Sequence, residues 1–332
     1  MINNTTTPMA NTTTPLSMID YFEANKLVPA DLDIEVEYLM HEFLVNESLN
    51  MIFASAGQGK SFLVLAIATK LLQEGKISRC FYLDMDNSTM ALKSRRLDDL
   101  LTNNLNLNYI HHSKTNISAA DTIFQLAYEA DVLNKSLQSN LIVLDSIRDF
   151  LGGRDMNADK DIIPVMNALK KLREAGATVV FLHHAKKDAD SKKEVYKGST
   201  SFIDSVDVAY SLQSEKMNAN TLEYSLSVYK DRIPVNNSSF SLNTDTLDLI
   251  QQNYELNQLT QHQQDFIKHV ENALEANPTG INQTNLLHAI GKSNDDKTAR
   301  KYLQKFSGQF WNSKTIPTAK NSLNYFPLKE VA

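Results

Sequence analysis

Residues 49–72, LNMIFASAGQGKSFLVLAIATKLL, decide the fold of this 332-residue chain. The apolar run at 49–53 predicts a buried strand, and residues 61–72 predict a helix that is apolar on most of its sides. The segment ASAGQGKS, at 54–61, connects the two. A strand, a glycine-containing loop and a helix in this order are the context that a phosphate-binding loop requires.

The loop also has the residue types that a bound triphosphate needs. A helix N-terminus presents backbone N–H groups and a favourable dipole to the phosphates. Gly57 and Gly59 let the backbone pass close to them. Lys60 can reach the β- and γ-phosphates, and the Ser61 hydroxyl can bind Mg²⁺. ATP and Mg²⁺ are therefore the predicted cofactors, and the expected nucleotide contacts are Ala56, Gly57, Gln58, Gly59, Lys60, Ser61 and Phe62.

The composition is that of a soluble globular protein. Hydrophobic residues make up 42% of the chain and charged residues 22%, which are ordinary values. No apolar run reaches membrane-spanning length, and the N-terminus has no apolar signal core. The single cysteine, Cys80, excludes an intrachain disulfide and fits a reducing compartment. We therefore expect a cytoplasmic protein without a membrane partner.

Alternating strands and helices follow the loop. Further buried strands are expected at 80–83, 140–144 and 178–182. Polar residues come after each of them: Asp86, Asp145 and His183. This pattern predicts an α/β fold with a mainly parallel central sheet, in which ligands bind at the C-terminal edge of the strands. Short strands between 206 and 250 predict an antiparallel extension of the same sheet.

The chain is expected to have four parts. Residues 1–15 repeat NTTTP, cannot form a core and are predicted to be disordered. Residues 16–252 would form the nucleotide-binding domain and 253–260 a polar linker. Residues 261–332 would form a small second domain. From residue 258 onward there are nine Lys and Arg against six Asp and Glu, although the whole chain has a net charge of -6. Such asymmetry is typical of proteins with a separate polyanion-binding part.

The second domain has the element order of a winged helix. Helices are expected at 261–276, 282–289 and 296–306, followed by two short strands around a polar tip. Seven basic residues and two acidic ones lie between Lys292 and Lys320. We expect this domain to bind duplex DNA through a recognition helix and a wing. The expected DNA contacts are Thr298, Arg300, Lys301, Lys305, Lys314 and Lys320. A winged helix that contacts protein is the alternative.

Six segments within residues 35–250 resemble the RecA-like hexameric ATPases, and in particular the RepA-type replicative helicases. They are ASAGQGKS, FYLDMDN, LIVLDSIRDFLGG, VVFLHHAKK, YKGSTSFIDSVDVAYSL and SVYKDRIP. The first is shared by many ATPase families. LHHAKK together with KGSTSFIDSVD is the specific part, because this pair marks the RepA-like branch.

The resemblance implies roles for several residues. Asp145 would hold Mg²⁺ together with Ser61. Asp86 would polarise the attacking water, at a place where the family norm is Glu. His183, followed by His184, would sense the γ-phosphate. The remaining matches are basic: Lys197 before a Gly-Ser pair, and Lys230 and Arg232, which related hexamers insert into the site of a neighbouring subunit.

The charged segment AKKDADSKKEVYKG, at 185–198, lacks apolar periodicity and predicts a loop. In such ATPases this loop faces a central channel, where single-stranded DNA would meet Lys186, Lys187, Lys192 and Lys193. A solvated surface loop is an equally good interpretation. Arg95 and Arg96, on a helix predicted at 88–101, could line the nucleotide site or a subunit interface, but a solvated helix face is the favoured interpretation.

The predicted function is that of an ATP-dependent DNA helicase or translocase that acts in replication as a homo-oligomer, expected to be a hexamer. ATP would be hydrolysed between subunits, with single-stranded DNA in the channel. Two alternatives stay open. One is an ATP-regulated DNA-binding protein, and the other is a recombinase-like ATPase that coats DNA without unwinding it.

Overall fold

The computed structural model describes residues 17–187, 194–316 and 322–328. The chain divides into two compact units, residues 1–37 and 38–332. The first unit contains helix α1 (Met18–Ala24) and the 3₁₀ helix η1 (Pro29–Leu32). Ser17 starts α1 with a capping box, in which its side chain and that of Asp20 each accept the other's backbone N–H. The segment predicted to be disordered, 1–15, lies outside the described residues.

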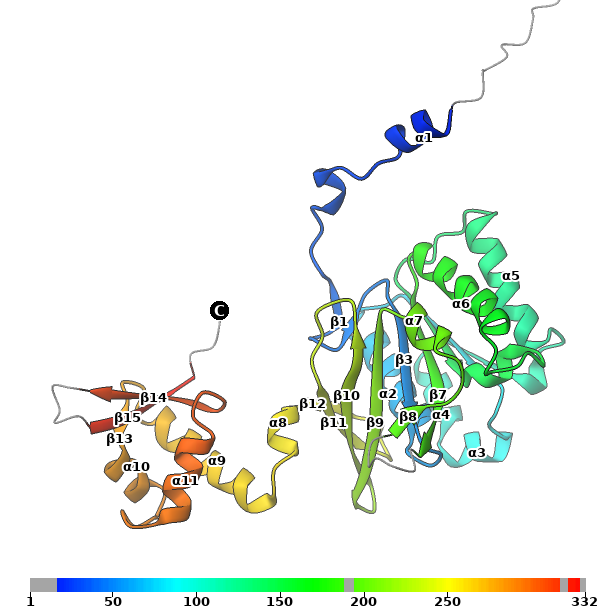
Figure 1. The fold of residues 1–332 in the computed structure, drawn as a ribbon. Coiled ribbons are helices and arrows are strands. Elements are labelled where there is room, and N and C mark those ends of the chain that lie inside the picture. Colours follow the sequence, from blue (N-terminus) through cyan, green and yellow to red (C-terminus); the bar gives the residue numbers. More distant parts are fainter. Residues whose placement is uncertain (1–16, 188–193, 317–321, 329–332) are drawn as a thin grey trace, which may run out of the picture. The chain divides into compact units, whose positions relative to one another are not determined.

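The second unit contains a large mixed sheet (Figure 1). Its strands are β3 (Leu49–Ala54), β4 (Arg79–Asp84), β5 (Leu107–His111), β6 (Asn140–Asp145), β7 (Thr178–Lys187), β8 (Glu194–Tyr196), β9 (Val208–Asn218), β10 (Thr221–Asp231), β11 (Ser238–Asn243) and β12 (Leu249–Gln252). The strand order is β12-β11-β10-β9-β3-β7-β6-β4-β5, and β8 pairs with β7. The strands from β9 to β5 in this order are parallel, whereas β10, β11 and β12 are antiparallel. The predicted α/β fold with an antiparallel extension is confirmed. A separate hairpin pairs β1 (Tyr38–Met40) with β2 (Leu44–Val45).

Helices cover both faces of the sheet (Figure 1). They are α2 (Lys60–Gln73), α3 (Thr89–Ser94), α4 (Leu97–Asn103), α5 (Ala119–Asp131), α6 (Asp159–Glu174), α7 (Ser201–Ser205) and the 3₁₀ helices η2 (His112–Lys114) and η3 (Ile147–Leu151). Side chains of β3 alternate between two apolar clusters: Ile52 packs with α2, and Phe53 packs with α5 and α6. Because both faces are covered, every residue of the strand is buried, and all but Asn50 are apolar.

Three segments differ from the sequence-based expectations. The segment 88–101, predicted as one helix, forms α3 and α4, with Arg96 in the left-handed region at φ 55° between them. The predicted loop at 185–198 begins as strand, because β7 continues to Lys187 and pairs with β8. The predicted linker at 253–260 contains a short helix, α8 (Tyr254–Asn257). Pairing with β8 extends β7, and the Asn253 side chain caps α8 by accepting the Leu256 backbone N–H.

The C-terminal part has its own apolar core. Its elements are α9 (Gln261–Glu275), β13 (Ile281–Asn282), α10 (Gln283–Ala289), α11 (Lys297–Lys305), β14 (Trp311–Ile316) and β15 (Ser322–Pro327). The strands form an antiparallel sheet in the order β13-β15-β14. Trp311 is fully buried and donates its indole N–H to the Leu303 carbonyl at 3.0 Å, so it anchors β14 to α11. Within the described ranges, no helix has both the length and the apolarity to cross a bilayer.

Candidate nucleotide-binding site at the sheet edge

The loop between β3 and α2 has the geometry expected of a phosphate-binding loop. The strand ends at Ala54 and the helix begins at Lys60. Gly57 and Gly59 have φ values of 81° and 69°, which L-residues with a side chain rarely adopt. The Phe62 side chain packs against the apolar cluster around α2, so only its backbone is placed to contact a nucleotide. Because α2 begins at Lys60, its first backbone N–H groups point towards the loop, where phosphates would bind.

Lys60 is held inside this loop. Its ammonium donates to the carbonyl oxygens of Ala54, at 2.9 Å, and Ser55, at 3.1 Å. The side chain is almost fully buried, and only 8% of the residue is exposed. A buried ammonium needs acceptors. Phosphate oxygens in the loop would offer it charged acceptors in place of the two carbonyls, which is a stronger kind of hydrogen bond.

Asp145, at the end of β6, and Ser61, in the first turn of α2, meet at the C-terminal edge of the sheet, where β7 lies between β6 and β3. Burial raises the pKa of Asp145 to about 6, while a hydrogen bond from the Ser61 side chain acts in the opposite direction. The Tyr82 hydroxyl donates to Asp145 at 3.0 Å and fixes the carboxylate. A hydroxyl and a carboxylate that converge on one point are oxygen ligands of the kind that Mg²⁺ prefers. These two residues therefore fit the predicted magnesium site.

Asp84 and Asp86 have different surroundings. Asp84 is fully buried, and its carboxylate accepts from the backbone N–H groups of Asp86 and Asn87 and from the Tyr109 hydroxyl. These hydrogen bonds occupy the carboxylate oxygens of Asp84 and fix the backbone of the turn after β4. Asp86, by contrast, is exposed at the tip of that turn. Only Asp86 is thus placed as the predicted water-polarising residue, and Asp84 orients it.

His183 and His184 lie in the middle of β7, beside the end of β3 that leads into the loop. In the parallel pairing, Phe53 lies opposite His183 and Ala54 opposite His184. His183 is fully buried, its Nε2 contacts the Lys197 carbonyl at 2.5 Å, and its Nδ1 has no hydrogen-bond partner among the residues that the structure describes. Burial lowers the pKa of His184, and Lys60 lowers it further while Asp86 raises it. The pair therefore lies between the loop lysine and the Lys197 segment.

Burial of His183 has a consequence for acid stability. Burial lowers its pKa to about 4, below the usual 6.5, so a proton binds more tightly to the unfolded chain. The contribution of neutral His183 to the free energy of unfolding is fully present above pH 6.5 and is lost as the pH falls towards 4. Between pH 7 and pH 5 we expect the His183→Asn variant to lose about 2 kcal/mol less free energy of unfolding than the wild type. Urea titrations measure this, with the exposed His288→Asn as the control, and equal losses would contradict the account.

Arg95, for which a solvated helix face is the favoured prediction and a place at the nucleotide site the alternative, lies near the candidate site. The break between α3 and α4 leaves it half-buried rather than on a solvated face. Its charge lowers the pKa of Asp145, Tyr109 and Tyr224, although burial and other contacts have larger effects on each. Arg95 therefore lies near the predicted magnesium site and the phosphate-binding loop. A positive φ at Arg96 could not be foreseen, because the segment 88–101 has an uninterrupted helical pattern.

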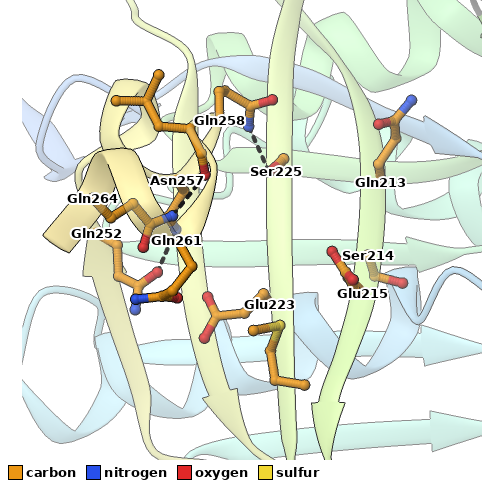
Figure 2. Close-up of a pocket in the computed structure, with 12 residues that line it drawn as sticks. Gln213, Ser214, Glu215, Glu223, Ser225, Gln252, Asn257, Gln258, Gln261 and Gln264 are labelled. Atoms are coloured by element: carbon orange, nitrogen blue, oxygen red, sulfur yellow. Dashed lines mark hydrogen bonds between the residues drawn. The ribbon is translucent and has the colours of Figure 1, made fainter. Parts of the chain in front are cut away.

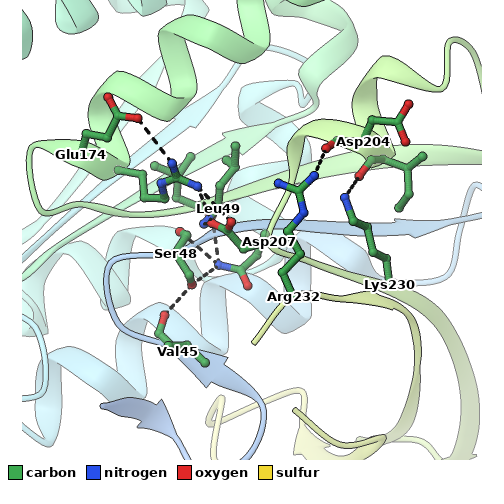
Figure 3. A network of polar contacts seen from close by, with 12 residues as sticks. Val45, Ser48, Leu49, Glu174, Asp204, Asp207, Lys230 and Arg232 are labelled. Carbon is green, nitrogen blue, oxygen red and sulfur yellow. Dashed lines mark hydrogen bonds and ion pairs between the residues drawn. The ribbon is translucent and has the colours of Figure 1, made fainter. Parts of the chain in front are cut away.

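The two cations expected to act on a neighbouring subunit lie at the edge of the sheet opposite the phosphate-binding loop. Figure 3 shows their contacts. Lys230 donates to the Ile203 carbonyl, and Arg232 donates to the Asp204 carbonyl. The Arg232 backbone N–H bonds the Asp207 carbonyl, and the Asp207 N–H bonds Leu49 at the start of β3. The loop follows the other end of β3, roughly 17 Å away along the strand. Neither cation reaches the loop of its own chain.

An ion pair fixes this edge. Arg173 donates to both carboxylate oxygens of Asp207 at 2.9 Å, and the Leu49 N–H donates to Asp207 at 2.9 Å (Figure 3). The bonds join α6, β3 and the start of β9, so they hold the segment from which Arg232 projects. Arg232 itself is exposed. The guanidinium is thus placed at the surface on a rigid base.

The remaining predicted residues have little defined surroundings. Lys197 is exposed and uses its backbone to bond His183 and His184. Lys186 is exposed on β7, and Lys187 is defined only as the end of that strand. Ala56 is exposed at the loop. The other predicted DNA contacts of this region and of the wing lie outside the described residues: Lys192, Lys193 and Lys320.

Comparisons with known proteins agree with this geometry. Residues 26–190 match the family model described as AAA domain. Among solved structures, a KaiC-like protein from the hyperthermophilic archaeon Pyrococcus horikoshii superposes with a TM-score of 0.46 and 10% identity, over 66% of this chain and 100% of that one. This likeness is too low to carry an argument. A search of curated proteins finds no match. The AAA match and the loop geometry support a P-loop ATPase.

Proposed function

We propose that this ATPase is a DNA helicase or translocase of the RepA type, which acts in replication as a ring, expected to be a hexamer, and hydrolyses ATP between its subunits. The observation that carries the proposal is the position of Lys230 and Arg232. They lie at the sheet edge opposite the phosphate-binding loop and cannot complete the site of their own chain. A second copy that places this edge against the loop would complete it.

Different residues at the loop would bind the phosphates of ATP and the Mg²⁺ ion. The backbone of 56–62 and the Lys60 ammonium would bind the phosphates, and Ser61 and Asp145 would hold the metal ion. Magnesium would neutralise charge on the phosphates. Asp86 would orient the attacking water, and Arg232 from the neighbour would stabilise charge on the transferring group. His183 and Lys197, joined by their hydrogen bond, are placed to transmit the state of the site to the β7–β8 segment.

The C-terminal part supports a role on DNA. Its elements follow the order of a winged helix, with α11 as the recognition helix and β14 and β15 as the wing. Thr298, Arg300, Lys301 and Lys305 are exposed on α11, and Lys314 is exposed on β14. Arg300 is oriented by a hydrogen bond to Asn294 at 3.1 Å, and Lys305 lies over the Phe306 ring. We propose that this surface binds duplex DNA through phosphate contacts.

The DNA surface can be tested with two lysines. We expect the double variant Lys301→Ala, Lys314→Ala to bind duplex DNA more weakly and to reduce the slope of log K against log salt by about two. Each lysine neutralises one phosphate and so releases about one counterion. Fluorescence anisotropy at several salt concentrations measures the slope. Lys268→Ala, exposed on α9, is the control, and a slope equal to that of the wild type would refute the surface.

A second candidate is an ATP-regulated DNA-binding protein, in which ATP controls assembly and no strand is unwound. Asp86 favours it, because its side chain is one methylene shorter than the Glu of related enzymes. Two assays separate the candidates. A helicase should show ATPase activity that single-stranded DNA stimulates, and it should unwind a forked duplex. Stimulation without unwinding would indicate a recombinase-like ATPase, and neither response would indicate a regulator.

The assembly can be observed directly. Electron microscopy with a non-hydrolysable ATP analogue and single-stranded DNA should show closed rings with density in the channel. Rings place the cations of one subunit against the loop of the next, since a head-to-tail interface closes by rotation. Isolated subunits under these conditions would contradict the proposed site.

A further inference from the structure

The phosphate-binding loop is attached to the antiparallel extension of the sheet. The Gln58 side-chain oxygen accepts two hydrogen bonds from Ser214 on β9, from the backbone N–H at 2.7 Å and from the hydroxyl at 3.1 Å. Gln58 is at the tip of the loop, 156 positions away in sequence. This contact fixes the tip of the loop to β9.

A second contact holds the next residue of the loop. The Tyr224 hydroxyl on β10 donates to the Gly59 carbonyl at 3.3 Å. A Cβ at Gly59 would lie only 2.6 Å from the same hydroxyl oxygen, so the ring fills the space under the loop. Tyr224 is fully buried. The helix start, where the phosphates bind, therefore rests on this side chain.

These two holding residues face each other in the sheet. Tyr224 on β10 and Ser214 on β9 are directly opposite in the antiparallel register. Directly paired residues point to the same face of a sheet, and their strand neighbours point to the other. One cross-strand pair therefore holds two consecutive loop residues. Gln213, Glu215, Glu223 and Ser225 belong to the opposite face.

That opposite face forms part of a polar cavity of 540 Å³ (Figure 2). The lining also includes Ser214 and Met217 on β9, Gln252 on β12, residues 257–259 at the end of α8, and Gln261 and Gln264 on α9. Gln258 donates to the Ser225 hydroxyl at 3.0 Å, and Asn257 donates to Gln252 on β12 (Figure 2). The Tyr254 hydroxyl contacts Ser227 at 2.8 Å. The strands that hold the loop on one face thus carry α8 on the other.

We propose that Ser214 and Tyr224 are positioning residues for ATP binding, and that the β9–β10 ribbon couples the loop to α8 on its opposite face. The proposal rests on the proposed nucleotide site. Because α8 precedes α9, the first helix of the C-terminal part, the ribbon connects the nucleotide site with the part that we propose binds DNA. By linkage, ATP that fixes the loop also fixes α8, and a change at α8 alters ATP affinity by the same factor.

The positioning role predicts a defined pattern of ATP affinities. Tyr224→Phe removes only the hydroxyl, and we expect the Kd for a fluorescent ATP analogue to rise about threefold to tenfold, the effect of one hydrogen bond. Tyr210→Phe is the matched control. Its hydroxyl donates to the Phe43 carbonyl at 2.7 Å from the same face of β9 but does not contact the loop. Similar affinities for the two variants would overturn the role of Tyr224.

A double-mutant cycle separates positioning from direct contact. Gln58→Leu and Ser214→Ala should each weaken ATP binding, and Ser214→Ala should add little once Gln58 is leucine, because Ser214 acts only through Gln58. Additive effects would show that Ser214 does not act through the loop. Unchanged melting temperatures show that the variants fold.

Hydrogen exchange tests the coupling to α8. In the full chain, the ATP analogue should slow amide exchange in residues 254–259, and the double variant Ser214→Ala, Tyr224→Phe should lose this protection even at saturating analogue. If wild-type exchange at 254–259 does not respond, the coupling is refuted. If the wild type does not bind the analogue at all, the proposed nucleotide site fails instead. If it binds and all variants match Tyr210→Phe, only the positioning inference fails.

Discussion

Replacing Arg232 by alanine should leave ATP binding intact and lower the turnover number about a thousandfold or more, the effect of an arginine supplied in trans. The guanidinium lies beside the start of β3, and the loop follows its end, so the loop of the same chain keeps all of its phosphate contacts. What is lost is the charge that a neighbour presents to the transferring phosphoryl group. Steady-state ATPase assays and binding of a fluorescent ATP analogue measure the two quantities separately.

The control for Arg232 is an arginine at the same sheet edge. Arg79 begins β4, is exposed, and is separated from β9 by β3, β7 and β6. Arg79→Ala should keep wild-type turnover. Because Arg232 also bonds the Asp204 carbonyl, melting temperatures must show that the variant is folded. Turnover that survives in folded Arg232→Ala would refute the assignment of this residue to the neighbouring site.

Replacing Lys60 by alanine should weaken ATP binding on the order of a hundredfold or more, the range seen when one partner of a buried charge-assisted contact is removed. The ammonium is almost fully buried inside the loop and directed by two carbonyls, so no other described side chain is placed to substitute for it. Loss of binding would also abolish turnover. Calorimetric titration with an ATP analogue and Mg²⁺ gives the affinity.

Lys70→Ala is the matched control for Lys60. Lys70 lies on the same helix, α2, and forms an exposed ion pair with Glu74 at 2.8 Å. Such pairs contribute little to stability, and this one is at the other end of the helix. We expect wild-type affinity for this variant. If Lys60→Ala binds ATP as Lys70→Ala does, the loop is not the nucleotide site.

The sequence predicted the elements that local patterns encode. The 49–72 stretch, the buried strands and their acidic ends all follow from apolar runs and turn residues, and the structure confirms this part of the fold. Parallel pairing then brings Asp145 beside the loop without further information, because the C-terminal ends of parallel strands meet at one edge. These features depend on short segments, so the sequence was sufficient for them.

Features that depend on contacts between distant segments were not predictable. The structure adds that Asp84 is buried and accepts hydrogen bonds from Asn87 and Tyr109, which leaves Asp86 as the exposed carboxylate. The loop at 185–198 became partly strand because β8 pairs with β7. The support of the loop by Tyr224 requires a register between β9 and β10 that no local pattern specifies. Pairing between distant segments therefore decides which side chains lie at the nucleotide site and which ones support the loop.

The central claim is that each ATP site is built from two subunits, and mixing two inactive variants tests it most directly. Lys60→Ala keeps Arg232, and Arg232→Ala keeps the loop. In a ring assembled from equal amounts, about a quarter of the interfaces would pair an intact loop with an intact arginine. We predict that the mixture regains ATPase activity in this range, although each variant alone is inactive. A mixture as inactive as its components would contradict the account.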